Sequence, residues 1–346
     1  MRAVVYDAYA VRPEVREVAE PTCPPDGVVL EVAATGVCRS DWHAWQGHDP
    51  VPLPMVPGHE LAGTVLEVGP EVRGWQVGDR VTVPFVCGCG RCSWCAAGEA
   101  QVCPDQQQPG FTMPGSYAER VALPAADANL VAVPDAVSMV VAASLGCRFA
   151  TAYRALTAHA PVPRDGWVAV HGCGGVGLSA VMIAAAHGAR VVAVDVREDA
   201  RSLARSVGAE VVLDPTATDV VEAVRDLSDG GAHVSLDAVG LSATAVASVS
   251  CLRRRGRHVQ AGLLLGEAAT PPLPMDLVVA HELSVHGTHG MAAHEYPAML
   301  AEVASGALRP DLLVGTTIGL DDAPAALAAV GTPAAPPGLT VVDLSI

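Results

Sequence analysis

The chain has 346 residues, 51% of them hydrophobic, and a formal net charge of −16. That length suffices for two domains with separate hydrophobic cores. The negative charge argues against a nucleic-acid partner, because such a surface needs clustered positive charge. All 21 basic residues are arginine, so mechanisms that need a Schiff-base lysine, a P-loop lysine or a Tyr-Lys proton pair are excluded.

The hydropathy pattern favours a protein that does not enter a membrane. No segment approaches the roughly 18 uninterrupted apolar residues of a membrane helix. The segment that starts at Met1 has the pattern of a strand and lacks the apolar core of a signal peptide. We therefore expect a cytoplasmic protein, in which the 10 cysteines are metal ligands or buried thiols rather than disulfides.

The first part of the chain, to about residue 125, has the pattern of short strands. Residues 28–33, 61–68 and 79–83 are rich in β-branched side chains, with glycine and proline between them. This pattern predicts an all-β module that carries long loops, with a barrel as one candidate form.

The second part alternates between strand and helix patterns. After a predicted helix over 144–159, apolar strand patterns are separated by helix patterns, and the alternation predicts a parallel sheet with helices on both faces. The predicted strands are 167–171, 190–195, 210–214, 233–237 and 256–261, and the predicted helices are 178–187 and 198–207.

Two further segments complete this description. The tail has a predicted helix over 294–305 and a final strand over 339–344, and we expect it to return to the first domain. The basic run from Arg253 to Arg257 is interpreted as a solvated helix end, with a polyanion site as the alternative.

Four cysteines lie close together in one segment. Cys89, Cys92, Cys95 and Cys103 have the spacing C-x2-C-x2-C-x7-C, and four thiolates suit the tetrahedral preference of zinc. An iron–sulfur site is the alternative, although the last gap is longer than in the common ferredoxin pattern. The neighbouring Cys87 is interpreted as a bystander. The pattern predicts a structural zinc site.

A second set of candidate ligands is dispersed along the chain. Cys38, the pair His59 and Glu60, and Cys147 span more than a hundred residues. Each has an ordinary alternative, such as a buried thiol or a core histidine that is fully hydrogen-bonded. Spacing alone does not bring these residues together, so a joint open metal site is one of two interpretations.

A glycine-rich motif follows the strand pattern that ends at residue 171. Its members Gly172, Gly174, Gly175, Val176 and Gly177 precede a helix pattern, which is the context that a dinucleotide fingerprint requires. The motif also contains a cysteine, residue 173, that we expect to make the loop sensitive to oxidation.

The end of the next strand bears on the choice of coenzyme. Asp195 stands there, where a carboxylate accepts hydrogen bonds from the ribose hydroxyls of NAD and repels the 2′-phosphate of NADP. The nearby Arg197 is the residue that could tolerate that phosphate. The motif therefore predicts NAD as cofactor.

From about residue 27 onward, the chain resembles the zinc-dependent alcohol dehydrogenases of the medium-chain dehydrogenase/reductase superfamily. The resemblance rests on Cys38-Arg-Ser-Asp-x-His, Gly58-His-Glu, the four-cysteine segment, Gly-Cys147 and the glycine motif, in that order. It implies a mixed α/β and β fold, with a GroES-like β-barrel catalytic domain and a Rossmann-type doubly wound parallel sheet. The expected domains are 1–148 with a zinc lobe at about 86–105, the NAD-binding domain 149–289, and a segment 290–346 that returns to the catalytic domain.

The resemblance also implies roles for the dispersed residues. Cys38, His59 and Cys147 are expected to hold a catalytic zinc ion, so that the chain binds two zinc ions in all. Glu60 is expected close behind the metal, where it can transiently replace a water ligand. Asp41 is expected to orient the histidine ligand.

Further residues match positions of the family that handle the substrate and the coenzyme. Ser40 matches a hydroxyl that contacts the substrate oxygen, and His43 matches the residue that passes its proton to solvent. Arg39 matches a contact to the pyrophosphate, and Thr151 one to the nicotinamide. A turn serine, a surface histidine, a solvated arginine and a helix-surface threonine are the respective alternatives.

The expected substrate is a small alcohol or its aldehyde or ketone. Trp42 and Phe85 are expected to line the pocket, which favours a primary or aromatic alcohol. A polyol or secondary-alcohol dehydrogenase of the same superfamily is one alternative, although its relatives often use an acidic residue in place of Cys147. A non-catalytic dinucleotide-binding protein is another. We also expect a homo-oligomer, either a dimer or a tetramer.

Overall fold

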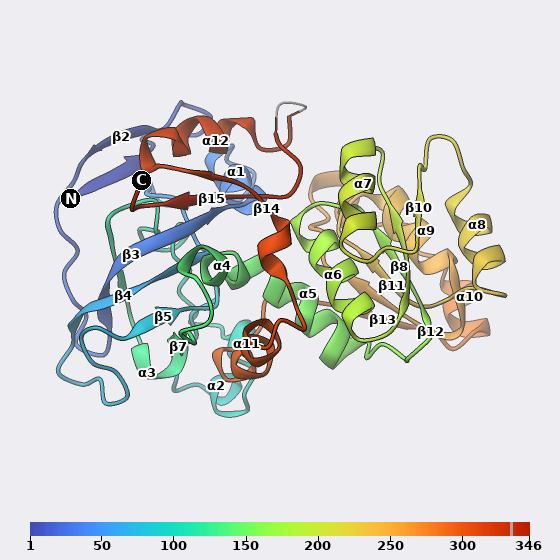
Figure 1. The fold of residues 1–346 in the computed structure, drawn as a ribbon, viewed down its shortest axis with the longest axis horizontal. Helices are drawn as coiled ribbons and strands as arrows, with labels where there is room; N and C mark the ends of the chain where they lie inside the picture. The colour runs from blue at the N-terminus through green and yellow to red at the C-terminus, as the bar shows by residue number, and fades with distance from the viewer. Residues whose placement is uncertain (333–334) are drawn as a thin grey trace. The chain divides into compact units, whose positions relative to one another are not determined.

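The computed structural model describes residues 1–332 and 335–346, and the described chain divides into two compact units (Figure 1). The first unit contains residues 1–150, 290–306 and 314–346, and the second contains 151–289 and 307–313. Residues 307–313 thus differ from the predicted division, which placed the whole tail in the first domain. The reason is local packing, because the short 3-10 helix η6 (Pro310–Leu313) lies against α6 (Gly175–Ala186) of the second unit.

The first unit is built on a seven-stranded sheet with the order β14-β15-β3-β4-β5-β7, in which β6 also pairs with β3. All of these pairs are antiparallel except β14 with β15, and β1 and β2 form a separate antiparallel pair. The strands are β1 (Arg2–Val5), β2 (Glu14–Glu17), β3 (Val28–Val37), β4 (Leu61–Val68), β5 (Arg80–Thr82), β6 (Arg120–Leu123), β7 (Val131–Ala132), β14 (Val314–Ile318) and β15 (Leu339–Asp343).

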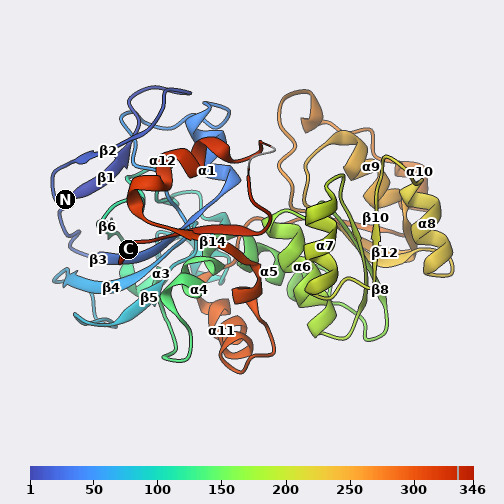
Figure 2. The ribbon, with the colours of Figure 1, turned by 45° about the horizontal axis from the view of Figure 1, so that its top comes forward.

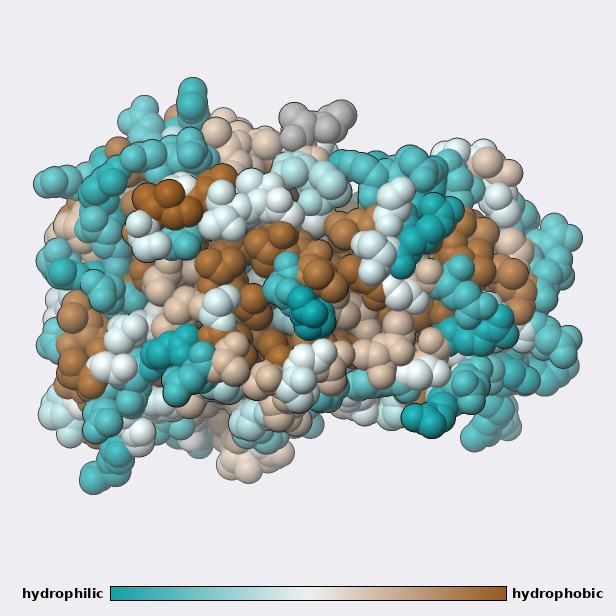
Figure 3. Space-filling view, viewed as in Figure 1, coloured by the Kyte–Doolittle hydropathy of each residue, from teal (hydrophilic) through white to brown (hydrophobic). Residues whose placement is uncertain are grey.

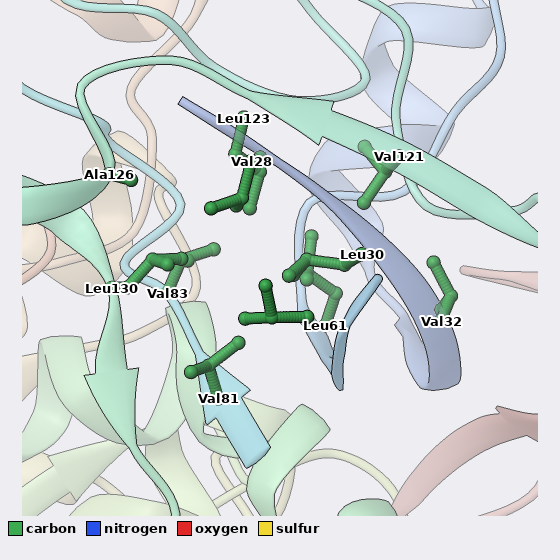
Figure 4. Packing of buried hydrophobic residues seen from close by; sticks show 11 residues of the cluster. Val28, Leu30, Val32, Leu61, Val81, Val83, Val121, Leu123, Ala126 and Leu130 are labelled. Carbon is green, nitrogen blue, oxygen red and sulfur yellow. The ribbon is translucent and has the colours of Figure 1, made fainter. Parts of the chain in front are cut away.

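The β-branched runs form strands because their alternate side chains share one apolar core (Figure 4). Val28, Leu30 and Val32 of β3 face Leu61 of β4 and Val121 of β6, and all are at most 3% exposed. Burying one such side chain contributes about 1.5–3 kcal/mol to folding. Because β15 pairs with β3, the C-terminal segment joins the sheet that the first part of the chain builds.

Short helices complete the first unit. They are α1 (Arg39–Trp45), α2 (Ser93–Ala96), α3 (Ala126–Asn129), α4 (Met139–Ala143), α11 (Tyr296–Ala304) and α12 (Ala323–Ala329), with the 3-10 helices η1 (Ala100–Val102), η5 (Ala293–Glu295) and η7 (Leu320–Asp322). The predicted helix over 144–159 consists of a π-helical turn η2 (Leu145–Phe149), α5 (Ala150–Arg154) and a second π-helical turn η3 (Ala155–His159). Single π-turns within helices are frequent at functional sites.

The second unit contains a six-stranded parallel sheet with the order β10-β9-β8-β11-β12-β13. Counted from β8 as the first strand, this is the 3-2-1-4-5-6 order of dinucleotide-binding folds. In Figure 2 the strands run between α6 and α7 on one side and α8, α9 and α10 on the other. The elements are β8 (Trp167–His171), β9 (Arg190–Val194), β10 (Val211–Leu213), β11 (Ala232–Asp237), β12 (Leu252–Gln260), β13 (Ser284–Gly287), α7 (Glu198–Ser206), α8 (Val220–Leu227), α9 (Ser242–Ser250), α10 (Met275–Ala280) and the 3-10 helix η4 (Gly266–Ala269).

Two sequence predictions differ from this structure. The helix that follows the glycine motif begins at Gly175 rather than at residue 178, because Gly175 and Gly177 themselves lie in the helix. The basic run Arg253–Arg257 lies in β12 and is not a helix end.

The surface is mixed in character. On the face drawn in Figure 3, hydrophobic side chains show in separate patches among hydrophilic ones. Within the described residues, the structure has no helix with the length and apolar character needed to cross a membrane.

Candidate active site and metal centres

The dispersed ligand candidates meet in the first unit. One ligand atom from each of Cys38, His59, Glu60 and Cys147 lies within 4.8 Å of the others. The antiparallel pairing of β3 with β4 sets Thr35 opposite Leu61, so the segments that carry Cys38 and His59 run side by side. The π-turn η2 supplies Cys147.

His59 is held with one nitrogen free for a ligand. Its Nδ1 lies 2.8 Å from Asp41 Oδ1, and both side chains are buried. Its buried Nε2 has no hydrogen-bond partner among the described residues. In the neutral imidazole the carboxylate accepts the Nδ1 proton, so Nε2 presents a lone pair, and a buried nitrogen without a partner costs free energy. A metal ion satisfies that lone pair, so the site fits zinc.

The electrostatics of the thiols also favour a cation. A hydrogen bond from Cys147 lowers the pKa of Cys38 well below its usual range, and Cys147 keeps the shared proton, so its own pKa rises. Burial disfavours the charged imidazole, yet Asp41 and the Cys38 thiolate raise the pKa of His59 well above its usual value. The group of ligands therefore attracts positive charge, which a divalent metal supplies better than a proton.

Glu60 forms hydrogen bonds and an ion pair with an arginine that the sequence analysis did not select. Glu60 Oε1 accepts hydrogen bonds of 3.0 Å from both the backbone N–H and the Nε of Arg148, and Oε2 pairs with Nη2. Arg148 Nη1 also donates to the Val37 carbonyl oxygen at 3.0 Å. Arg148 therefore competes with a metal ion for the Glu60 carboxylate, which already lies beside the other ligand atoms. The only signal in the sequence was that Arg148 follows Cys147 directly.

Helix α1 carries the predicted proton path. Cys38 precedes its first turn and Ser40 and His43 follow on it. His43 Nδ1 lies 3.1 Å from Nδ1 of the exposed His48. Burial, with the charge of Arg39, lowers the pKa of His43 below its usual value. A neutral imidazole that contacts an exposed one is suited to moving a proton toward solvent, although sequence reasoning gave His48 no part in this path.

Aromatic rings flank the ligand histidine. The ring centroid of Phe85 lies 5.9 Å from that of His59, and Phe111, which the sequence analysis did not select, lies at 5.3 Å. Trp42 packs instead against His43 and the core around Trp45. Phe85 is therefore better placed than Trp42 to shape a pocket at the ligands.

The four-cysteine lobe is folded as its spacing predicts. One sulfur from each of the four cysteines lies within 4.8 Å of the others: Cys89, Cys92, Cys95 and Cys103. Hydrogen bonding from the Arg91 backbone lowers the pKa of Cys89 to about 7, which favours the thiolate that metals bind.

Cys87 lies outside that group. Its thiol contacts the Pro84 carbonyl oxygen at 3.6 Å, and burial raises its pKa to about 12. The interpretation as a bystander is consistent with this position.

Each glycine of the dinucleotide motif has a distinct geometry. Gly172 has a φ of +92°, which favours glycine. A Cβ at Gly174 would meet no atom within 4 Å, so this stretch of backbone is open to a ligand. A Cβ at Gly177 would lie 1.7 Å from the Gly172 carbonyl oxygen, which enforces close packing of helix on strand. The N-terminal turn of α6, with Gly175 and Val176, is suited to a phosphate charge.

Asp195 closes the other side of this loop. Its Oδ2 accepts a hydrogen bond of 2.7 Å from the Cys173 N–H, and its Oδ1 accepts one of 2.8 Å from the Arg197 N–H. The Arg197 guanidinium pairs with Asp199, which holds it away from the role of a phosphate ligand.

Cys173 lies enclosed in the glycine loop rather than exposed on it. The thiol is 3% exposed, and burial raises its pKa to about 12. The prediction of an oxidation-sensitive loop is therefore not supported, because oxidation needs an accessible thiolate. The contacts of Arg39 and Thr151 with the coenzyme stay predictions.

Comparison with known proteins identifies the family of the chain. Residues 24–135 match the family model described as the alcohol dehydrogenase GroES-like domain, and residues 175–305 match the zinc-binding dehydrogenase model. An alcohol dehydrogenase of Geobacillus stearothermophilus is 35% identical over 291 residues, which are 83% of this chain and 84% of the relative.

Solved structures extend the similarity over almost the whole chain. A structure described as an NAD-dependent alcohol dehydrogenase has a TM-score of 0.89 and 31% identity, and covers 99% of this chain and 100% of that one. The alcohol dehydrogenase from Thermus sp. ATN1 has a TM-score of 0.91 and 31% identity, with 99% of each chain covered. The predicted combination of a GroES-like domain with a Rossmann-type sheet is confirmed. The chain belongs to the zinc-type alcohol dehydrogenases of the medium-chain dehydrogenase/reductase superfamily.

Proposed function

We propose that this enzyme is an NAD-dependent alcohol dehydrogenase whose catalytic zinc is held by Cys38, His59 and Cys147. The observation that carries the proposal is the buried Nε2 of His59, which lacks a partner among the described residues and lies beside two thiols. Three protein ligands leave a fourth position for substrate, as catalytic zinc sites require. The reaction is the interconversion of an alcohol with its aldehyde or ketone.

The cofactors supply the chemistry that the side chains lack. Zinc contributes Lewis acidity, which polarises an alcohol or carbonyl oxygen, and NAD accepts or returns the hydride. The chain contains no lysine to take over this activation.

The residues around the ligands orient them and move a proton. Asp41 fixes the imidazole of His59 so that Nε2 stays available. Ser40 contacts the substrate oxygen in this proposal, and His43 passes the proton to His48 and on to solvent. Arg148 restrains Glu60 at the edge of the site.

In the second unit, the glycine motif is proposed to bind the pyrophosphate of NAD. The open face of Gly174 and the turn at Gly175 support this role. Asp195 is proposed to bind the adenosine ribose and to select against NADP. The variant Asp195→Asn, with the exposed Asp226→Asn of α8 as control, tests this selection. We expect the ratio of kcat/KM for NAD over NADP to fall about tenfold or more, since one charge-assisted hydrogen bond contributes about 1.5–3 kcal/mol. An unchanged ratio would remove Asp195 from this role.

Measuring zinc and turnover together tests the main proposal. Wild-type enzyme should contain two zinc ions per chain and oxidise alcohols with NAD, followed by NADH absorbance. A preparation that retains one zinc ion and has no activity would support the non-catalytic alternative.

A substrate panel addresses the second enzymatic candidate. Primary, aromatic and secondary alcohols and polyols should be compared by kcat/KM. Cys147 as the third ligand and Phe85 beside His59 favour primary or aromatic alcohols. Highest activity on polyols would favour the alternative instead. The assignments as a cytoplasmic protein and as a homo-oligomer stay predictions.

A further inference from the structure

The basic run of the sequence forms an irregular segment of the second unit. Ala232 of β11 pairs with Leu252 of β12, but Val234 already pairs with Arg257. Residues 253–256 therefore bulge out of the ladder, and Arg255 has a φ of +63°, a conformation that costs free energy for a residue with a side chain. Bulges of this kind redirect side chains, and here the side chains are arginines.

The arginines of this run line a cavity of about 360 Å³. His233 and Pro161 contribute to its wall, together with Arg253, Arg254 and Arg257, and its lining contains no aspartate or glutamate. Strands β11 and β12 begin at this cavity, whereas the glycine motif follows the end of β8. Because the strands are parallel, the cavity and the glycine motif lie at opposite ends of the strands. In a chain with a net charge of −16, this is a local concentration of positive charge.

Two hydrogen-bond donors in this cavity face each other without an acceptor. The Trp167 N–H donates to His233 Nδ1 at 3.0 Å, so the neutral imidazole carries its proton on Nε2. Arg253 Nη1 lies 2.8 Å from that Nε2, and a guanidinium only donates. Burial, with the charge of Arg253, lowers the pKa of His233, which keeps the imidazole neutral.

The arginines of the run differ in whether they already have an acceptor partner in the protein. Arg255 pairs with Glu282, and Arg254 donates to the Ala280 carbonyl oxygen at 3.1 Å. Arg253 and Arg257 have no carboxylate partner among the described residues. These two guanidinium groups are therefore available to an external anion.

We propose that this cavity is an anion site for a small phosphate compound, held by Arg253, Arg257 and the Nε2–H of His233. A phosphate group offers acceptor oxygens in several directions, which suits donors that converge from two strands better than a planar carboxylate does. The cavity volume suits more than a single phosphate, so pyrophosphate or the phosphate end of a nucleotide is the expected ligand. This site is separate from the proposed NAD and zinc sites, and its existence does not depend on them.

The test is calorimetric titration of the full-length enzyme with pyrophosphate, in the presence of saturating NADH. Wild-type enzyme should bind pyrophosphate, and Arg253→Ala and Arg257→Ala should each weaken binding about tenfold or more, because each loses a charge-assisted hydrogen bond. The matched control is Arg205→Ala, which removes the same charge from the exposed face of α7. A parallel titration with ATP distinguishes the sources, since tighter binding of ATP indicates a nucleotide and equal binding indicates free phosphates.

Three results would overturn the proposal. The first is no pyrophosphate binding by wild-type enzyme at millimolar concentration. The second is equal binding by the Arg253, Arg257 and Arg205 variants. The third is competition between NADH and pyrophosphate, which would place the anion at the glycine motif instead. NADH affinity and the thermal unfolding midpoint should match wild type in all variants, which shows that any loss does not come from misfolding.

Discussion

The two metal-ligand groups differ in how the chain assembles them. The lobe brings its four cysteines together within one short segment, whereas Cys38, His59 and Cys147 come from a strand end, a loop and a π-turn. A local group can form wherever its segment folds, and its main consequence is the stability of that segment. A dispersed group exists only when the sheet has formed, and it can leave one coordination position open for chemistry. We therefore expect mutations in the dispersed group to reduce mainly turnover, and mutations in the lobe to reduce mainly stability.

The largest effect on turnover should come from Cys38→Ser. This variant should lose one zinc ion and at least about 1000-fold in kcat/KM, because Lewis-acid stabilisation contributes several kcal/mol. Metal analysis and NADH absorbance measure the two quantities. Cys23→Ser, a change of the same kind away from both groups, should behave as wild type. Full activity in Cys38→Ser would contradict the assignment of the catalytic metal.

His43→Gln should have the next largest effect, a loss of about 100-fold in alcohol oxidation, at the low end for general acid–base catalysis. Oxidation needs the neutral imidazole as proton acceptor. Since burial lowers the pKa of His43 below 6.5, wild-type activity should persist to below that pH and fall as the pH drops further through the lowered pKa.

The pH profile of kcat/KM measures this effect. His43→Gln should lack the acidic limb of that profile. An acidic limb that is unchanged in the variant would assign it to another group and exclude the relay.

Arg148→Gln should reduce turnover by about 10-fold or more, as loss of a partner to groups around a metal does. It should also lower the free energy of unfolding by about 3–5 kcal/mol, because Glu60 is left buried without its counter-charge. Urea denaturation measures the second effect. The double variant Glu60→Gln with Arg148→Gln should recover part of the stability, and a strictly additive loss would show that the two side chains act independently.

The smallest effect on turnover is expected for Cys103→Ser in the lobe. This variant should lose one zinc ion and unfold at a lower temperature, while turnover per folded molecule stays within about threefold of wild type, since the structural metal contributes to folding rather than to chemistry. Thermal unfolding and kinetics on the same sample compare the two. A loss of activity as large as in Cys38→Ser would contradict the claim that the lobe contributes to stability rather than to chemistry.

Several features could be predicted because their physics is local. The cysteine spacing, the glycine motif with its following Asp195, and the alternation of strands and helices each depend on neighbours in the chain. Cys173 and the run Arg253–Arg257 were misjudged for the opposite reason. Burial encloses the thiol, and the arginines lie in β12 rather than at a helix end.

Other residues of the site had no pattern that could reveal them. Arg148 reaches Glu60 across 88 positions of sequence. Phe111 reaches His59 by a loop, and His48 enters the proposed proton path only through its contact with His43. No sequence pattern marks these side chains as part of a site, because their contacts form only in the folded protein.

The class of fold, the compact cysteine lobe and the dinucleotide motif could be recognised from the amino-acid sequence alone, because each is a short pattern with a local physical cause. The tertiary structure decided which dispersed side chains meet, since only the pairing of β3 with β4 and the position of η2 place Cys38, His59 and Cys147 together. It also decided which polar atoms are left without partners. The free Nε2 of His59 and the facing donors of Arg253 and His233 are properties of burial and contact, which no spacing in the sequence encodes.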